Sequence, residues 1–186
     1  MKADELRWDN RYSSKAYSDV PNKIVEQFYH IAQKGQALDI AAGSGRNTSF
    51  LAEVGYRVDA IDISSVGLHK IAEKNQRINR IHADLEFYEL QPNQYDLVIN
   101  INFLQRRLFP QIIRSLKTGG ILIFQTFMFN ILEGEKNDTL KKGHLLFKNE
   151  LLHEFLDLQI IYYEEKKAAP ANEKEREIAI LVAEKM

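Results

Sequence analysis

The sequence feature that most constrains the fold is a short apolar run that leads directly into a glycine-rich turn, within residues 36–47. Residues 37–40 predict a buried strand, the turn contains Gly43 and Gly45, and a helical pattern then continues to Gly55. A strand, a tight turn and a helix in this order are typical of the opening of a βαβ nucleotide-binding unit. Glycine suits such a turn because a backbone without a Cβ atom can approach a ligand closely.

The spacing within the turn distinguishes three classes of nucleotide site. A P-loop requires Lys and then Ser or Thr after its last glycine, whereas Arg46 and Asn47 stand here. A dinucleotide fingerprint requires a third small residue three positions after the second glycine, and that position is Thr48. The pattern instead resembles motif I of the class I S-adenosylmethionine-dependent methyltransferases, acidic-x-Gly-x-Gly-x-Gly. The corresponding positions are Asp39, Ala41, Gly43 and Gly45, and Ala41 stands where the pattern has its first glycine.

A second apolar run, residues 58–61, ends in another acidic residue, Asp62. A carboxylate at the carboxyl end of a strand can accept hydrogen bonds from both hydroxyl groups of a ribose. The alternative is that Asp62 caps the helix expected to begin near Ser64. Since Ser64 and Ser65 can provide that cap themselves, we favour the ribose-binding role for Asp62.

Three further markers strengthen the resemblance to the methyltransferases. They are the segments 82–85 and 95–100 and the Leu-Lys-Thr-Gly-Gly turn at 116–120, and with the first two they span about residues 37–127. The resemblance implies that Asp84 binds the adenine amino group and that the polar end of the 95–100 strand faces the methyl-transfer site. It implies a site for S-adenosyl-L-methionine formed by Trp8, Arg11, Tyr12, Asp39, Ala41, Gly43, Gly45, Arg46, Asp62, Ile63, Asp84, Leu85 and Asn100.

The segment 4–19 carries three aromatic residues among many polar ones. Small methyltransferases of the tellurite-resistance and thiopurine type keep a similar Trp-x-x-x-Tyr segment, so the resemblance implies a lid over the cofactor, within residues 1–20. The alternative is a helix in which Trp8 and Tyr12 pack against the domain at i, i+4. Both interpretations remain open at this point.

The rest of the chain predicts a single α/β domain over residues 1–186. Helical stripes are expected in 21–35, after the second strand from Leu68 to Ala72, near Pro110 and in 147–155, and the fifth strand in 121–127. The last two strands, 158–163 and 178–183, are joined by a charged connection without a helix, so the last strand should be antiparallel. We therefore expect a three-layer Rossmann-like fold, with a seven-stranded, mostly parallel sheet and helices on both faces. The long stretch 128–146 is expected to cover the substrate.

Composition excludes several classes of function. The chain has 45% hydrophobic and 27% charged residues, a net charge of -1 and no cysteine. These values exclude thiolate catalysis and give no electrostatic reason to expect a nucleic acid or membrane partner. The five histidines have no metal-ligand spacing, so no metal is predicted, and no Gly-x-Ser-x-Gly context supports a hydrolase. Without an apolar span or a signal peptide, the expected location is the cytoplasm.

Arg106 and Arg107 follow the fourth strand, at the sheet edge where ligands bind. We predict that the substrate contacts Asn102, Phe103, Arg106, Arg107 and Phe127. The alternative for the two arginines is that they lie in a solvated turn. The predicted activity is methyl transfer to a small soft or anionic acceptor, such as a metalloid oxyanion or a thiol, by a monomer or homodimer. No catalytic residue is predicted. The alternatives are a nicotinamide-dependent (NAD(P)) Rossmann oxidoreductase and a non-catalytic S-adenosylmethionine-binding protein.

Overall fold

The computed structural model describes residues 2–15, 17–71, 75–129, 142–168 and 176–186. Ala72, most of the expected substrate-covering stretch 128–146 and part of the connection between the last two strands lie outside the described residues. The helices and strands alternate along the chain, as expected for an α/β domain. The described helices are α1 (Lys2–Ser14), α2 (Lys23–Phe28), α3 (Arg46–Glu53), α4 (Ser65–His69), α5 (Phe109–Ser115) and α6 (Glu150–Glu154), with 3-10 turns at Tyr29–Ile31, Arg106–Leu108 and Lys142–His144.

Seven strands form one sheet in the order β3-β2-β1-β4-β5-β7-β6. β7 pairs antiparallel with both β5 and β6, and all other pairs are parallel. The prediction of a seven-stranded, mostly parallel sheet with an antiparallel last strand is therefore confirmed. The strands are β1 (Gln36–Ile40), β2 (Arg57–Asp62), β3 (Ile78–His82), β4 (Tyr95–Ile101), β5 (Leu116–Phe127), β6 (Gln159–Ala168) and β7 (Arg176–Glu184).

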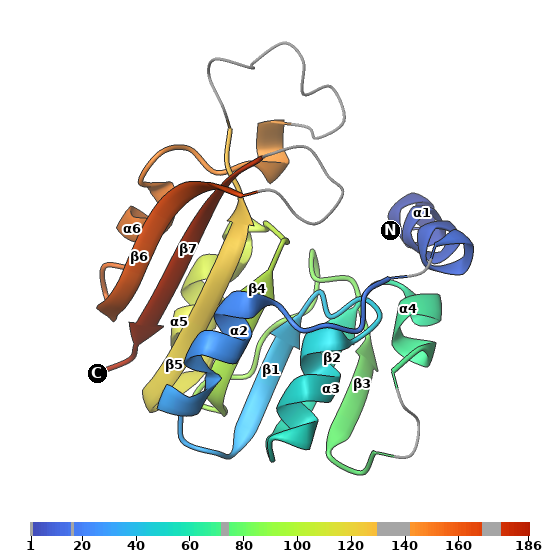
Figure 1. Cartoon of the computed structure of the whole chain (residues 1–186), viewed down its shortest axis with the longest axis horizontal. Helices are drawn as coiled ribbons and strands as arrows, with labels where there is room; N and C mark the ends of the chain where they lie inside the picture. The colour runs from blue at the N-terminus through green and yellow to red at the C-terminus, as the bar shows by residue number, and fades with distance from the viewer. Residues whose placement is uncertain (1, 16, 72–74, 130–141, 169–175) are drawn as a thin grey trace.

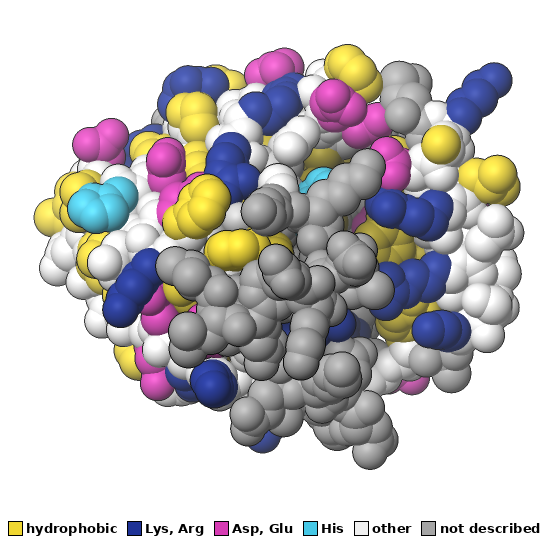
Figure 2. All heavy atoms as spheres, turned by 90° about the horizontal axis from the view of Figure 1, so that it is seen from above, with side chains coloured by type: hydrophobic (Ala, Val, Ile, Leu, Met, Phe, Trp, Pro, Cys, Tyr) yellow, Lys and Arg dark blue, Asp and Glu magenta, His cyan; other side chains and the backbone are white. Residues whose placement is uncertain are grey.

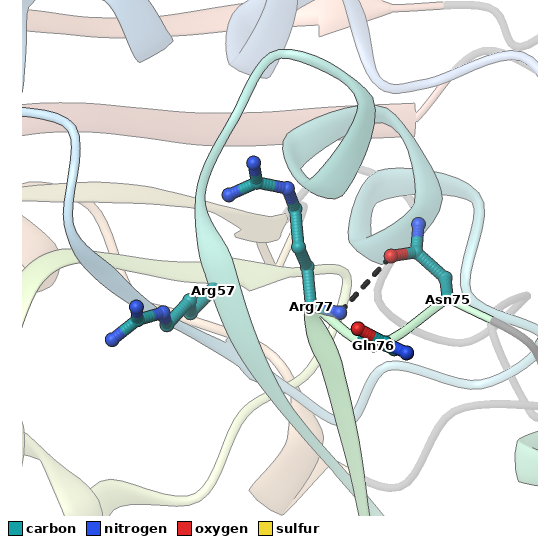
Figure 3. Close-up of a pocket in the computed structure, with 4 residues that line it drawn as sticks. All are labelled: Arg57, Asn75, Gln76 and Arg77. Atoms are coloured by element: carbon teal, nitrogen blue, oxygen red, sulfur yellow. Dashed lines mark hydrogen bonds between the residues drawn. The ribbon is translucent and has the colours of Figure 1, made fainter.

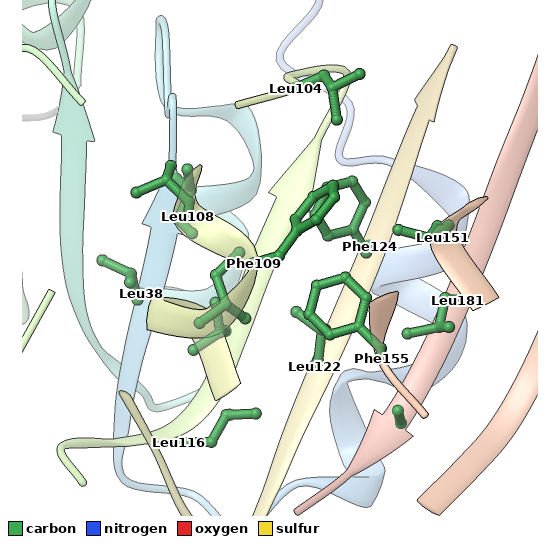
Figure 4. Packing of buried hydrophobic residues seen from close by; sticks show 14 of the residues in the cluster. Leu38, Leu104, Leu108, Phe109, Leu116, Leu122, Phe124, Leu151, Phe155 and Leu181 are labelled. Carbon is green, nitrogen blue, oxygen red and sulfur yellow. The ribbon is translucent and has the colours of Figure 1, made fainter. Parts of the chain in front are cut away.

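Two hydrophobic clusters, one on each face of the sheet, form the core. α2 and α3 cover one face, where Val25 and Leu51 pack against β-strand residues such as Ile99. α5 and α6 cover the other face, where the rings of Phe109 and Phe155 lie 5.3 Å apart (Figure 4). Helices on both faces of a parallel sheet give the three-layer arrangement seen in Figure 1.

The carboxyl ends of the parallel strands meet at one edge of the sheet, drawn at the top of Figure 1. The order of the strands reverses between β1 and β4, where Ile40 pairs with Asn100. In open α/β sheets the crevice outside such a reversal is the usual ligand site. The fold therefore places the glycine turn after β1 at this position.

β5 begins five residues earlier than the expected 121–127, because Leu116 already pairs with Tyr95 before a register shift in β4. Gly119 has a φ of +77°, and its N–H donates a hydrogen bond to the Lys185 carbonyl at 2.7 Å. The Leu-Lys-Thr-Gly-Gly segment is thus the irregular beginning of the strand rather than a separate turn.

Candidate functional site

The turn after β1 is built from residues in the left-handed region of the backbone map. Ala41, Gly43 and Gly45 have φ values of +55°, +58° and +81°. The Gly45 N–H donates to the Ala42 carbonyl at 3.0 Å and closes the turn. The left-handed conformation of Ala41 explains why glycine is suited to this position, since a Cβ atom is disfavoured there.

Neighbours within the chain also restrict the turn to glycine. A Cβ atom on Gly45 would lie 2.4 Å from Cγ1 of Ile71, and one on Gly43 would lie 2.3 Å from the Tyr12 hydroxyl oxygen. A Cβ atom on Gly67 in α4 would lie 2.9 Å from the carbonyl oxygen of Gly43. The absence of side chains at these positions therefore serves the packing of α1 and α4 on the turn, in addition to any approach by a ligand.

Asp39 lies beneath the turn and is almost completely buried. Its carboxylate accepts a hydrogen bond of 2.6 Å from the Thr48 hydroxyl of α3. Burial raises the pKa of Asp39 from its ordinary value of 3.8 to about 7, although the Thr48 hydrogen bond opposes the shift. The first acidic residue of the motif thus holds α3 against β1 from inside the protein.

Asp62 ends β2 with both carboxylate oxygens engaged. They accept the N–H of Gly43 at 2.8 Å and the N–H of Ser64 at 2.7 Å. The prediction that Ser64 caps the following helix is confirmed, because its hydroxyl accepts the Gly67 N–H at 3.0 Å. Burial raises the pKa of Asp62, and the two N–H groups oppose this effect. An ionised carboxylate has about four lone-pair directions, so two remain for a ligand.

The first turn of α4 also binds α1, through a residue, Asp9, that no sequence motif indicated. Asp9 accepts hydrogen bonds from the Ser64 hydroxyl at 2.5 Å and from the Val66 N–H at 3.2 Å. The Lys70 ammonium donates to the Tyr12 carbonyl, and His82 lies 3.1 Å from a carboxylate oxygen of Glu5. α1 is therefore attached to α4 and to the end of β3.

Trp8 and Tyr12 stack within α1, with ring centroids 5.9 Å apart, and Tyr12 is buried. The Arg11 guanidinium lies 5.0 Å from the centroid of the Trp8 ring. The prediction of a helix that packs through Trp8 and Tyr12 is confirmed. Its role as a cofactor lid stays a prediction, and the position of Tyr12 against Gly43 is compatible with it.

The predicted adenine-binding residues follow β3. Asp84 is half-buried, and one carboxylate oxygen accepts the Glu86 N–H at 2.9 Å. Leu85 is buried in the core, and the carbonyl of Ile63 lies 2.9 Å from Nε2 of His82. Asp84 has a local role in shaping this turn, and its other carboxylate oxygen has no hydrogen-bond partner among the residues that the structure describes.

The ends of β4 and β5 carry the remaining predicted residues. Asn100 is buried, and its amide donates to the Phe103 carbonyl at 2.7 Å, shaping the loop after β4. Asn102 has φ +60° and accepts a hydrogen bond of 3.3 Å from Gln125. Phe103 packs against the core, and the Arg176 guanidinium lies 5.0 Å from the Phe127 ring centroid.

The structure does not support Arg106 and Arg107 as a free pair of cations for a substrate. Arg106 pairs with Glu150 through two hydrogen bonds of 2.5 and 2.9 Å, and it also donates to the carbonyls of Gly143 and Leu145. Arg107 donates to the Glu86 and Tyr88 carbonyls and pairs with Glu89. These partners come from distant parts of the chain, so sequence spacing could not indicate them.

The face above the carboxyl ends of the strands is shown in Figure 2. On its described part, cationic, acidic and apolar side chains are mixed, and several Lys and Arg side chains lie beside apolar ones at the right of the view. Among the described residues no group of three or more His, Cys, Asp and Glu side chains could hold a metal ion. No described helix is long and apolar enough to cross a membrane.

A separate hollow lies at the opposite edge of the sheet, where β2 and β3 begin. It is lined by Arg57, Asn75, Gln76 and Arg77 (Figure 3). The Asn75 side chain accepts the Arg77 N–H at 3.0 Å, and the Arg77 guanidinium donates to the Gly55 carbonyl at 3.3 Å. Because ligands in open α/β sheets bind at the carboxyl edge, this hollow is not the candidate cofactor site.

Comparison with known proteins agrees with this geometry. Residues 37–120 match the family model described as "Methyltransferase domain". A Bacillus subtilis (strain 168) protein named "Putative methyltransferase YqeM" is 31% identical over 106 residues, which cover 50% of this chain and 43% of that protein. The chain thus spans less than half the length of this curated relative.

Two solved structures show the same fold. TehB from Haemophilus influenzae superimposes with a TM-score of 0.73 at 20% identity, covering 98% of this chain and 67% of TehB. Phosphoethanolamine N-methyltransferase 2 of Haemonchus contortus, in complex with S-adenosyl-L-methionine, gives a TM-score of 0.72 at 16% identity. That match covers 96% of this chain and 60% of the nematode enzyme.

Proposed function

We propose that this chain, whose residues 37–120 match a methyltransferase domain model and whose fold is shared with TehB, is an S-adenosyl-L-methionine-dependent methyltransferase that acts on a small acceptor. The observation that carries the proposal is the set of acidic residues at three adjacent strand ends. Asp39 lies one residue before the end of β1, Asp62 ends β2 and Asp84 follows β3, and these three strands are neighbours in the sheet. Their order along the chain and across the sheet is the order that the resemblance to the family implies.

The residues at this edge fit the parts of the cofactor. The turn at 41–45 offers backbone without side chains at Gly43 and Gly45, and Asp62 retains acceptor capacity for ribose hydroxyls. Asp84 has one carboxylate oxygen without a partner among the described residues, and this oxygen is proposed to accept the adenine amino group. Trp8, Arg11 and Tyr12 lie on the helix beside the turn and are proposed to cover the cofactor.

S-adenosyl-L-methionine supplies an activated methyl group when bound. The contribution of this chain is then to hold and align the two reactants and to exclude water from them. α1 is proposed to exclude water, since the hydroxyl of its Tyr12 lies against Gly43 of the turn. We assign no residue as catalytic.

We propose a small, soft or anionic acceptor, such as a thiol or a metalloid oxyanion, and not a nucleic acid or a membrane. The net charge of -1 and the mixture of charges on the described part of the face in Figure 2 support this choice. The arginines no longer support it, because Arg106 and Arg107 have partners within the chain. Asn102, Phe103 and Phe127 stay candidates for acceptor contacts. A cytoplasmic monomer or homodimer is part of the same proposal.

Calorimetric titration with S-adenosylmethionine, S-adenosylhomocysteine and NAD tests the cofactor. We expect binding of the first two only, and tighter binding of NAD would favour the oxidoreductase alternative instead. Methyl-donor turnover against a panel of thiols, oxyanions, amines and carboxylates then tests the acceptor. Cofactor binding without turnover across the panel and in a cell extract would favour a non-catalytic binding protein.

Asp62→Ala tests the ribose contact. We expect a loss of roughly 2–3 kcal/mol in cofactor binding. The variant should also be less stable, because the buried N–H groups of Gly43 and Ser64 lose their acceptor. Asp96→Ala is the matched control, since Asp96 accepts the Gln36 N–H at 2.7 Å at the opposite edge of the sheet. It should lower stability without changing cofactor affinity.

A further inference from the structure

The hydroxyl group of Tyr17 is buried and has no hydrogen-bond partner among the described residues. Tyr17 lies on the connection from α1 to α2, which passes the carboxyl ends of β2 and β1 in Figure 1. The Asn22 N–H on this connection donates to the Asn47 side chain in the first turn of α3 at 2.8 Å. Tyr17 is thus held beside the glycine turn, with a hydrogen-bonding capacity that no other described residue uses.

Tyr17 and Tyr12 form an aromatic pair over the turn. Their ring centroids are 4.7 Å apart, and the Tyr12 hydroxyl lies against Gly43. A buried hydroxyl without a partner costs free energy, because the water that it binds in the unfolded chain is not replaced. Such a cost at a ligand site is offset when a ligand supplies the acceptor.

A second unused donor belongs to the same neighbourhood. Arg46, the first residue of α3, is half-buried, and among the described residues its guanidinium has no ion-pair or hydrogen-bond partner. Arg46 directly follows Gly45 of the turn. Burial raises the pKa of Tyr12, and the positive charge of Arg46 is among the effects that oppose this rise. The edge near the turn therefore combines one acceptor, Asp62, with two donors that have no acceptor among the described residues.

We propose that the Tyr17 hydroxyl and the Arg46 guanidinium bind the carboxylate of the aminocarboxypropyl end of the cofactor, while Asp62 receives the ribose. The inference rests on the proposed function, since it assigns one end of S-adenosylmethionine to these donors. A carboxylate only accepts hydrogen bonds, so it complements the O–H donor of the hydroxyl and the N–H donors of the guanidinium. Binding of this group requires the Tyr12 and Tyr17 rings to separate, because the Tyr17 hydroxyl is buried.

The test compares S-adenosylmethionine with its decarboxylated form by calorimetry on the full chain, in the wild type and in Tyr17→Phe. We expect Tyr17→Phe to bind S-adenosylmethionine about ten-fold more weakly, since a hydrogen bond to a charged group is lost. Its affinity for the decarboxylated form should equal that of the wild type. Arg46→Gln should show the same selectivity for the carboxylate.

Thermal melting of the unliganded protein provides a second readout. Tyr17→Phe removes a hydroxyl that has no partner, so its melting temperature should be equal to that of the wild type or higher. Tyr56→Phe is the matched control, because the Tyr56 hydroxyl donates to the Tyr29 and Ala32 carbonyls at 2.7 and 3.1 Å. It should melt at a lower temperature and bind S-adenosylmethionine normally.

Three outcomes would overturn the inference. They are an unchanged affinity of Tyr17→Phe for S-adenosylmethionine, an equal loss for both ligands, and an effect confined to the KM of the acceptor. The last outcome would assign the hydroxyl to the acceptor rather than to the cofactor. Failure of the proposed function is distinct from all three, because the wild type would then bind neither S-adenosyl compound.

Discussion

The buried carboxylate of Asp39 gives the sharpest prediction for stability. Its pKa rises from 3.8 to about 7 on folding, so between these values the folded protein holds a proton that the unfolded chain releases. Stability must therefore fall as the pH increases through this range. Between pH 5 and pH 8 the loss from this one group amounts to about 2.5 kcal/mol, at 1.36 kcal/mol for each pKa unit.

Asp39→Asn isolates this contribution, because the amide cannot ionise and its oxygen can still accept the Thr48 hydroxyl. Urea unfolding of the wild type and the variant at pH 5, 6, 7 and 8 measures the difference in unfolding free energy between them. We expect this difference to shift in favour of Asp39→Asn by about 2.5 kcal/mol from pH 5 to pH 8. Any constant cost of the introduced amide cancels in this comparison.

Thr48→Val provides the matched control, since it removes the hydrogen bond that opposes the rise in the pKa of Asp39. The fall in stability should then extend to a higher pH, because the pKa of Asp39 in the folded protein rises further while its pKa in the unfolded chain is unchanged. Parallel stability profiles for the wild type and Asp39→Asn would refute the reasoning, because they would show that Asp39 is ionised in the folded protein throughout this range.

Three further substitutions test individual contacts. Ala41→Gly should stabilise the protein by about 0.5–1 kcal/mol in urea unfolding. The reason is that the steric strain of a Cβ atom in the left-handed conformation exceeds the entropy cost of glycine. Destabilisation would show that the Ala41 methyl group is needed for packing. Gly45→Ala should cost roughly 3 kcal/mol, since the new Cβ atom meets Ile71, and a neutral result would mean that Ile71 moves freely. Arg106→Ala should lower stability by roughly 1–3 kcal/mol by removing the pairing with Glu150, and leave cofactor affinity unchanged; loss of cofactor binding instead would contradict the structural role of Arg106.

Local sequence patterns were sufficient to predict the sheet and the position of the glycine turn. Apolar runs, acidic residues and glycines occur within short stretches, so strand ends such as Asp62 can be recognised from local pattern alone. The antiparallel β7 also followed from local information, because two strands joined without a helix must run in opposite directions. The helical pairing of Trp8 with Tyr12 is another property of neighbouring residues.

The contacts of these residues depend on the packing of distant segments and became visible only in the folded protein. Arg106 was predicted to contact a substrate, but its side chain pairs with Glu150, which lies 44 residues away in the sequence. Asp62 bridges the turn and the start of α4 across 19 residues, which gives it a structural role in addition to ribose binding. Tyr17 is one of several tyrosines in the sequence, and only the packing around it leaves its hydroxyl buried without a partner among the described residues. Hydrogen bonds between distant segments depend on how the elements pack, and local periodicity carries no record of that packing.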